Sequence, residues 1–393
     1  MVAETARKFE ALEAQAQKLM SVFIKAGHEA VAPAIIQPAS VFLDVIGETL
    51  RARTYVFADP DGSELCLRPD LTVPTCRLHI ERHSDPTTKA KYCYNGSAFR
   101  FQPAGAPAVH PREFRQAGIE NFGAPDRAKA EAQTLVTLLD GLKAAGLSEF
   151  KLYIGDLGLF RALLEAAEMP LRWRRRLMHQ FWRPEAFRTE LKRLTTVATD
   201  VPRDMPKELL TKLDPERPED AERQVAAYLD ERSIEILGTR SLGEITQNLL
   251  SIVADSKTQP LSAATANLLE NYVRVVAPAR AAGARLRDLL RDVDIDISEA
   301  FEAYQRRLQL LADAGIDVTH AEFEAEFGRT LEYYTGFVFE IVVPELGRAS
   351  PIAGGGRYDT LMRQCGADVD ADIAAVGGAI HTERLLAALT GDV

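Results

Sequence analysis

The segment "REFRQAGIENFGAP" at residues 112–125 decides the fold. Its apolar and polar residues alternate and it stops at Gly-Ala-Pro, which predicts a β-strand. The preceding segment "KYCYNGSAFRFQPAG", residues 91–105, has the same character, and the short connection predicts antiparallel pairing. Gln116, Gly118 and Glu120 are two residues apart, so a strand places them on one face. The small Gly118 between two polar side chains predicts room for a ligand backbone.

The segments on both sides of this hairpin extend the sheet and add helices. Residues 54–74 predict a second hairpin with its turn at residues 59–62, because Asp-Pro-Asp-Gly separates two apolar alternations. Further strands are predicted at residues 150–156, 331–344, 350–362 and 373–380. Amphipathic helices are predicted at residues 5–27, 72–83, 126–146 and from Glu383 to Leu389.

The helical and strand-rich parts alternate along the chain. Residues 166–315 are almost wholly helical in pattern and are broken by proline-containing joints. The strand-rich parts, residues 1–165 and 316–393, flank this helical insertion, and an insertion leaves the ends of its host close together. We therefore predict an α+β fold in which both outer parts form one antiparallel sheet flanked by helices.

Bulk composition limits the classes of function. The 393 residues carry a net charge of −10, with 46% hydrophobic and 26% charged residues, which is typical of a soluble globular protein. Four cysteines without a CxxC pair predict reduced thiols in the cytoplasm. Seven histidines without ligand spacing argue against a protein-held metal. No apolar run is long enough to cross a membrane.

A basic and aromatic tract, "LRWRRRLMHQFWR" at residues 171–183, stands out in this acidic chain. The first interpretation is an amphipathic helix whose aromatic residues pack inward while its arginines are solvated or pair with acidic neighbours. Nucleic-acid contact and a protein-docking surface are the alternatives.

Several other polar residues are candidates for ligand binding. Asp70 and Thr72 of "LRPDLT", like Arg100 and Gln102 of "FRFQ", share a face if their segments are extended. Carboxylates bind an ammonium group, and arginine binds a carboxylate or a phosphate with two hydrogen bonds. Together with the 116–120 face, these residues suit a zwitterionic amino acid.

Two further segments carry aromatic residues and glycines. "GRTLEYYTGFVFE", residues 328–340, offers Arg329, Tyr333 and Tyr334. In an extended segment the adjacent tyrosines point to opposite faces, so at most one of them lines a pocket. "GGGRYD", residues 354–359, indicates a backbone that needs either positive φ or close approach of another chain segment.

Taken in order, "LRPDLT", "FRFQ", "REFRQAGIE", "LEYYTGFVFE", "GGGRYD" and "GGAIHTERL" resemble the catalytic core of histidyl-tRNA synthetases, a class II fold, over residues 5–165 and 318–393. The resemblance implies that Arg100 and Arg384 stand at positions that contact ATP phosphates, and Arg329 at that of the catalytic arginine. It also implies a histidine site, whose candidate residues are Asp70, Thr72, Arg100, Gln116, Glu120, Arg329, Tyr333 and Tyr334.

The chain departs from the synthetase pattern at several positions. Gln102 replaces a glutamate, His381 replaces a glycine, and Thr330 and Glu332 change another motif. Asp70 is shorter than the family's glutamate. Only nine residues follow Arg384, so we expect no anticodon-binding domain. Arg100, Gln102 and Arg384 are then predicted to be the remains of a nucleotide site.

This combination is similar to the synthetase-like regulatory subunits of ATP phosphoribosyltransferase. The similarity implies a cytoplasmic protein without catalytic residues or cofactor, in a homodimer within a larger hetero-oligomer. Its implied partner is the short-form catalytic subunit, which needs it for activity and for feedback by L-histidine in the first step of histidine biosynthesis. No tRNA or membrane is implied. A tRNA-independent histidine-adenylating enzyme and an assembly scaffold without a histidine site are the alternatives.

Overall fold

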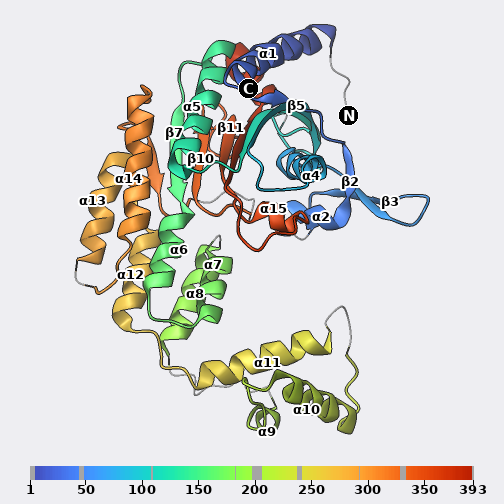
Figure 1. Cartoon of the computed structure of the whole chain (residues 1–393), viewed down its shortest axis with the longest axis vertical. Coiled ribbons are helices and arrows are strands. Elements are labelled where there is room, and N and C mark those ends of the chain that lie inside the picture. Colours follow the sequence, from blue (N-terminus) through green and yellow to red (C-terminus); the bar gives the residue numbers. More distant parts are fainter. Residues whose placement is uncertain are drawn as a thin grey trace. The chain divides into compact units, whose positions relative to one another are not determined.

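The computed structural model describes residues 5–43, 48–107, 109–181, 183–196, 206–236, 241–291, 293–327 and 333–391. The chain divides into two units (Figure 1). Unit 1 is Met1–Leu163 together with Tyr272–Val393, and unit 2 is Leu164–Asn271. In the described part of the chain, no helix is both long enough and apolar enough to cross a membrane.

Unit 1 is built on a nine-stranded mixed sheet. In spatial order its strands are β1 (Glu29–Ala30), β5 (Ala90–Phe99), β6 (Glu113–Phe122), β12 (Ala375–His381), β11 (Ala353–Arg357), β10 (Phe337–Val342), β7 (Lys151–Asp156), β9 (Glu322–Glu324) and β8 (Val276–Pro278). The six strands from β5 to β7 pair antiparallel, whereas β1–β5 and β7–β9 are parallel. The predicted joining of both ends of the chain in one sheet is confirmed.

The centre of the sheet pairs β6 with β12, the last strand of the chain. In the β6–β12 register, Glu120 lies opposite Gly377 and Gln116 lies opposite His381. Because side chains alternate along each strand, these four residues share one face. This pairing brings two motifs that are far apart in sequence to the same surface.

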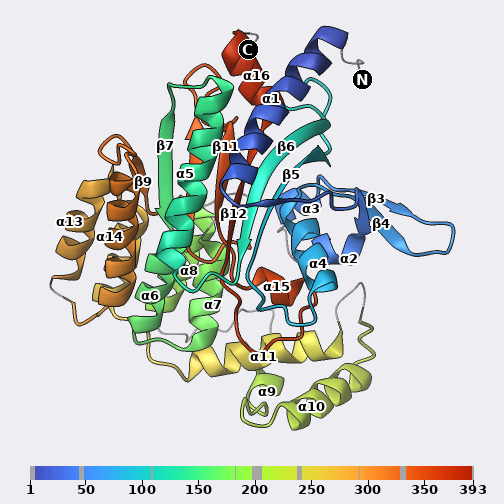
Figure 2. The ribbon, with the colours of Figure 1, turned by 45° about the horizontal axis from the view of Figure 1, so that its top comes forward.

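Helices cover the sheet on both faces (Figure 2). On one face α1 (Ala6–Lys25) packs against α5 (Arg127–Ala145), α14 (Ser298–Asp313) lies beside α5, and α16 (Thr382–Thr390) contacts α1. On the other face α4 (Thr72–Arg82) contacts the short α15 (Leu361–Gln364). Gly146 ends α5 with φ 111°, a conformation that glycine adopts without strain.

A smaller sheet in unit 1 contains the predicted second hairpin. Its strand order is β2 (Ile36–Pro38), β4 (Glu64–Leu67) and β3 (Tyr55–Ala58), all antiparallel. Gly62 has φ 89° in the turn between β3 and β4, as the Asp-Gly sequence predicts. The short helices α2 (Ala39–Leu43) and α3 (Glu48–Arg51) lie between β2 and β3 in sequence.

The remaining elements are almost all helical, in agreement with the sequence pattern. Unit 2 holds α7 (Leu171–Gln180), α8 (Pro184–Thr195), α9 (Lys207–Leu210), α10 (Pro218–Glu231) and α11 (Leu242–Ser256). The helices α6 (Leu157–Ala166) and α12 (Ala263–Val273) cross the unit boundaries, and α13 (Ala279–Leu290) belongs to unit 1. Unit 2 is therefore shorter than the predicted helical insertion, residues 166–315. That residues 166–315 are an insertion stays a prediction.

The basic tract of residues 171–183 packs within unit 2. The Trp173 side chain is buried, and its Nε1 donates to Asp255 Oδ1 at 2.6 Å. Three arginines also bind this buried carboxylate: Arg172, Arg176 and Arg193. The interpretation with inward aromatic residues and paired arginines is thus confirmed for these residues. Trp182 lies outside the described residues.

Candidate functional site

The predicted polar face of β6 is present and closed over. Gln116 and Glu120 are both buried on the face that carries α4, and the register places Tyr94 of β5 opposite Gly118. The prediction that Gly118 leaves room for a ligand is wrong, because a Cβ atom there would lie 2.6 Å from the Tyr94 hydroxyl oxygen. The glycine instead accommodates the aromatic ring of its cross-strand neighbour.

Glu120 is the centre of a buried hydrogen-bond network. Its side chain is fully buried. Its Oε1 accepts hydrogen bonds from Thr72 Oγ1 and Tyr94 Oη, both at 2.8 Å, and its Oε2 accepts one from Tyr358 Oη. A Cβ on Gly377 would collide with Glu120 Oε2, so the glycine makes the space that this carboxylate occupies. The network fixes both carboxylate oxygens.

Burial governs the charge of this carboxylate. Desolvation raises the pKa of Glu120 to about 7, while the three hydroxyl donors oppose that shift and the charge of Asp70 adds to it. A carboxyl group that titrates near neutrality binds a cation by losing its proton. The site can therefore take up an ammonium group at neutral pH.

Asp70 and Thr72 reach this site by a different route from the predicted one. Strand β4 ends at Leu67, and Thr72 begins α4, so the expected extended segment is wrong. Asp70 Oδ1 accepts a hydrogen bond from the Val73 backbone N–H at 3.2 Å, which favours the start of a helix here. Both side chains are nevertheless buried, and Thr72 bonds directly to Glu120.

Tyr333 lies in a turn and Tyr334 follows it before β10, outside any strand, so the alternation expected of an extended segment does not apply. Their ring centroids are 4.9 Å apart. Both rings also approach Tyr358, at 5.7 Å and 6.4 Å between centroids. The two side chains thus gather on the side of the Glu120 network. Arg329, Thr330 and Glu332 lie outside the described residues.

The glycine run of "GGGRYD" had two interpretations, positive φ and close approach of another chain segment. The structure shows close approach. Gly354–Gly356 belong to β11, and none of them is among the described glycines with positive φ. A Cβ on Gly355 would collide with the Gly377 carbonyl oxygen, and one on Gly356 would lie 2.8 Å from a methyl group of Val338. Close approach of neighbouring strands therefore explains these glycines.

The predicted nucleotide residues meet in a cavity at the other end of the same sheet face. This cavity has a volume of about 270 Å³, and Arg100, Gln102 and Arg384 all line it together with His381 and Glu383. Strand β5 ends at Phe99, so Arg100 and Gln102 lie in the following loop and not on a strand face as expected. The loop still brings both residues to Arg384.

The chain itself binds the Arg384 guanidinium. Nε donates to the Val109 carbonyl oxygen at 3.2 Å and Nη1 to that of Pro351 at 2.8 Å, while Nη2 lies 3.0 Å from His110 Nδ1. Burial and the adjacent Arg384 charge lower the pKa of His110, so the neutral ring accepts at Nδ1. Its Nε2 then donates to Ser350 Oγ at 2.8 Å.

Aromatic packing fills part of the same cavity. His381 stacks on Phe114 with the ring centroids 5.0 Å apart and the planes at 29°. The Arg100 guanidinium carbon lies 5.1 Å from the same ring, and Arg100 Nε donates to the Pro69 carbonyl oxygen at 2.8 Å. The Phe114 ring is therefore already in contact with two side chains of the chain.

Sequence reasoning missed two partners of Glu120. Tyr94 is a cross-strand neighbour of Gly118, and only the pairing register reveals that contact. Tyr358 follows the glycine run, and the backbone of that run is the more conspicuous feature of the segment. Within the described ranges, no group of three or more histidine, cysteine, aspartate or glutamate side chains has the arrangement of a metal site.

Comparison with known proteins gives a consistent result. The family model for histidyl-tRNA synthetase matches residues 4–239 and 244–385. The ATP phosphoribosyltransferase regulatory subunit of Brucella anthropi is 34% identical over 89% of this chain and 90% of its own length. That of a Chelativorans species is 32% identical over 90% of this chain and 91% of its own length.

The chain belongs to the ATP phosphoribosyltransferase regulatory subunit family. Two solved structures are similar to this chain in fold. An ATP phosphoribosyltransferase regulatory subunit/histidyl-tRNA synthetase from Bacillus halodurans has a TM-score of 0.67 at 21% identity, covering 99% of this chain and 81% of its own. The histidyl-tRNA synthetase of Nostoc sp. PCC 7120 has 0.59 at 15%, covering 97% and 72%. The predicted class II synthetase-like fold is confirmed.

Proposed function

We propose that this chain is a non-catalytic subunit that binds L-histidine on the Glu120 face and conveys the histidine concentration to a short-form ATP phosphoribosyltransferase catalytic subunit. Membership of the regulatory subunit family supports the assignment to that enzyme. The observation that carries the histidine site is the buried Glu120 carboxylate, fixed by three hydroxyl donors beside Asp70.

The chemistry of this face suits an amino acid. The Glu120 and Asp70 carboxylates are a favourable environment for an α-ammonium group. Gln116 Oε1 is buried and has no hydrogen-bond partner in the described part of the chain, so a ligand N–H can satisfy it. An imidazole N–H supplies such a donor. Tyr333 and Tyr334 add aromatic surface against which a planar ring can pack.

The nucleotide end supports a role without catalysis. Arg384 makes three contacts with the chain's own oxygen and nitrogen atoms, and His381 packs on Phe114. A phosphate or an adenine ring would have to displace these contacts. The tRNA-independent histidine-adenylating enzyme remains the second candidate, because Arg100 and Arg384 still line one cavity. Histidine-dependent exchange of pyrophosphate into ATP separates the two functions.

Regulation then requires coupling between two binding events. Histidine must bind one state of the hetero-oligomer more tightly than the other, and such coupling free energies are typically about 1–3 kcal/mol. The cytoplasm is the proposed location, in keeping with four free thiols at Cys66, Cys76, Cys93 and Cys365.

The small sheet supports the proposed homodimer. The register puts Ile36, Phe57 and their neighbours Tyr55, Leu65 and Leu67 on one face. The side chains of Ile36 and Phe57 are 52% and 38% exposed. An apolar face of this kind typically marks a protein interface. We propose that two copies pair here and that the pair joins the catalytic subunit in a larger symmetric complex.

Calorimetric titration of the purified subunit with L-histidine tests the histidine site. Glu120→Gln keeps the shape of the side chain and removes the charge, so we expect the dissociation constant to rise at least about tenfold. Glu113→Gln is the matched control, since Glu113 is an exposed glutamate of the same strand. Equal affinity in all three proteins would refute the site and favour the scaffold without a histidine site. Inhibition by histidine is then measured with the catalytic subunit added.

A further inference from the structure

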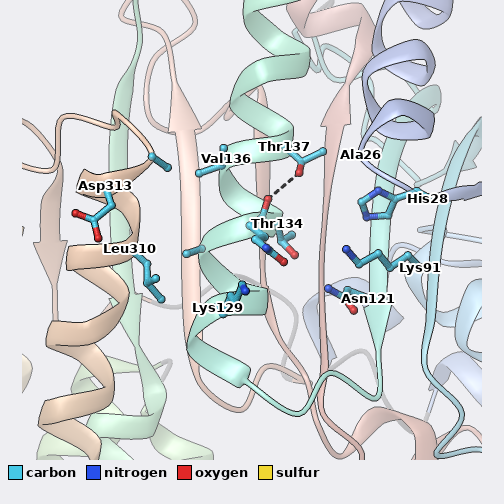
Figure 3. Close-up of a pocket in the computed structure, with 13 residues that line it drawn as sticks. Ala26, His28, Lys91, Asn121, Lys129, Thr134, Val136, Thr137, Leu310 and Asp313 are labelled. Atoms are coloured by element: carbon cyan, nitrogen blue, oxygen red, sulfur yellow. Dashed lines mark hydrogen bonds between the residues drawn. The ribbon is translucent and has the colours of Figure 1, made fainter.

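A second cavity of unit 1 lies on the face of the sheet opposite the Glu120 network (Figure 3). Its volume is about 440 Å³, within the usual range for small-molecule sites. Helix α5 contributes the largest share of its lining, α14 forms one side, and the segment after α1 with strands β5 and β6 forms the other. The proposed histidine site uses none of these lining residues.

The strand register explains why the cavity lies behind Glu120. Asn121 follows Glu120 on β6, and successive strand residues point to opposite faces. Lys91 of β5 is the register partner of Asn121, so the two side chains share the α5 face. Figure 3 shows Lys91 and Asn121 side by side across from α5.

Two buried polar side chains line the cavity without a protein partner. Asn121 is 6% exposed and Thr134 is 3% exposed. Neither side chain has a hydrogen bond to another group in the described ranges of the chain, and neither has a polar atom that is both fully buried and without a partner. Their amide and hydroxyl groups are therefore open to the cavity, where water or a ligand can bind them.

The charge of the lining favours an anion. Lys91 and Lys129 line the cavity, and neither makes an ion pair within the described residues. The acidic residue of the lining, Asp313, already accepts a hydrogen bond from Gln309 Nε2 at 2.7 Å. Among the described lining residues, the cavity therefore holds Lys91 beside the Asn121 amide, a second cation at Lys129 on α5, and one carboxylate on the far side at α14.

A neutral histidine completes the polar lining. Burial lowers the pKa of His28 to about 4, and the nearby Lys91 charge contributes to this shift. His28 Nδ1 lies 3.1 Å from the Phe23 carbonyl oxygen, so Nδ1 carries the proton and donates it. The Nε2 atom is then an acceptor at neutral pH. A ligand with a hydrogen-bond donor as well as an anionic group matches this arrangement.

We propose that this cavity binds a small organic anion. Its carboxylate or phosphate group binds Lys91, Lys129 and the Asn121 amide, and its apolar body packs on Val136 and Leu310. A bare inorganic ion would leave most of this volume empty and would not contact the apolar side chains of the lining. The proposal stands independently of the histidine site, because the two sites share no residue.

Fluorine NMR titration of the full chain tests the proposal, with 4-(trifluoromethyl)benzoate and 4-(trifluoromethyl)phenyl phosphate as probes. We expect saturable binding of at least one probe, and the tighter one identifies the anionic group. The neutral 4-(trifluoromethyl)benzamide should bind at least about tenfold more weakly. Lys91→Met should weaken the charged probe by a similar factor. Lys151→Met is the matched control on β7 and should change nothing.

Filling the cavity gives a second, independent variant. Val136→Phe adds volume on the lining of the cavity and should abolish probe binding while the thermal unfolding temperature shows that the protein remains folded. Equal binding of the benzamide and the benzoate would overturn the proposal. So would unchanged affinity in the Lys91→Met protein, or the absence of saturable binding in the millimolar range.

Discussion

One sheet face has a Glu120 end and an Arg384 end. Strands β6 and β12 run through both ends, and Arg384 lies on α16, which follows β12. The hydrogen-bond partners of the two charged side chains differ. At the Glu120 end, neutral hydroxyl groups surround an acidic side chain whose pKa is raised to about 7. At the other end, carbonyl oxygens and a neutral histidine bind the permanently charged guanidinium of Arg384.

This difference separates a site that can respond to a ligand from one that is already occupied. Hydroxyl groups leave the charge of Glu120 uncompensated, so an incoming ammonium group gains a large electrostatic interaction in a buried environment. Arg384 has no comparable gain from a phosphate, because binding would first break hydrogen bonds to the chain. Variants at the two ends should therefore differ in their effect on histidine binding.

The largest expected effect is that of Gly377→Ala. The new methyl group would collide with Glu120 Oε2 and lie 2.7 Å from the Ile119 carbonyl oxygen, so the carboxylate must leave its place. We expect the free energy of unfolding to fall by about 1–3 kcal/mol. Histidine binding should be lost in calorimetry. The control is Gly243→Ala in α11, where the nearest atoms to a new Cβ are 3.9 Å and 4.0 Å away.

That control should keep its stability within about 1 kcal/mol of the parent, or gain, because alanine favours a helix over glycine. Retention of histidine binding by the Gly377→Ala protein would show that the position of the Glu120 carboxylate is irrelevant to the ligand. The proposed difference between the two ends would then be contradicted at the Glu120 end.

The next effect is a pH dependence that belongs to the Glu120 end alone. Burial raises the pKa of Glu120 from 4.5 to about 7, so the folded state holds this proton more tightly than the unfolded state. The resulting contribution to stability is fully present below pH 4.5 and is lost as the pH rises through about 7. The expected slope is at most about 1.4 kcal/mol per pH unit.

Urea unfolding of the parent and of Glu120→Gln, measured between about pH 5 and pH 8, isolates this slope as a difference. The glutamine variant lacks the titrating group and should lose less stability as the pH rises. Histidine binding should instead strengthen as the pH rises through 7, with release of a proton, since the ammonium group binds the carboxylate form. Identical pH profiles of both proteins would contradict the raised pKa.

Local alternation predicts the strands of this face but not the contacts across them. The segment 112–125 indicated a strand with Gln116 and Glu120 on one face, and β6 has this arrangement. Whether Gly118 is open or covered depends on which residue of β5 lies opposite. That residue is Tyr94, whose ring fills the space, and its identity requires the register of two separate strands.

Competition between local structures explains the other failures. Asp70 and Thr72 are polar residues two positions apart, a pattern that suits a strand. Asp70 nevertheless accepts a hydrogen bond from a backbone N–H in the first turn of α4. The helix start therefore prevails over the strand pattern. The cavity behind Asn121 had no sequence signal, because its lining comes from two helices, two strands and the segment that follows α1, which are far apart in sequence.

The smallest expected effect is that of Arg384→Met. Methionine keeps the unbranched side chain and removes the donors to Val109, Pro351 and His110. These bonds hold residues 109–110 and 351 beside α16, and the side chain is partly exposed. We therefore expect the free energy of unfolding to fall by only about 1–2 kcal/mol, as for a few partly solvated hydrogen bonds to a charged group.

The decisive measurement for this variant is histidine titration, which should give the parent affinity, because Arg384 supports its own end of the sheet face only. Arg363→Met is the matched control: Arg363 pairs with Asp372 at 2.9 Å on the surface, and the loss of an exposed pair costs less than about 1 kcal/mol. If Arg384→Met weakened histidine binding as strongly as Glu120→Gln, the two ends would act as one site. The arginine would then belong to the histidine pocket and not to the remains of a nucleotide site.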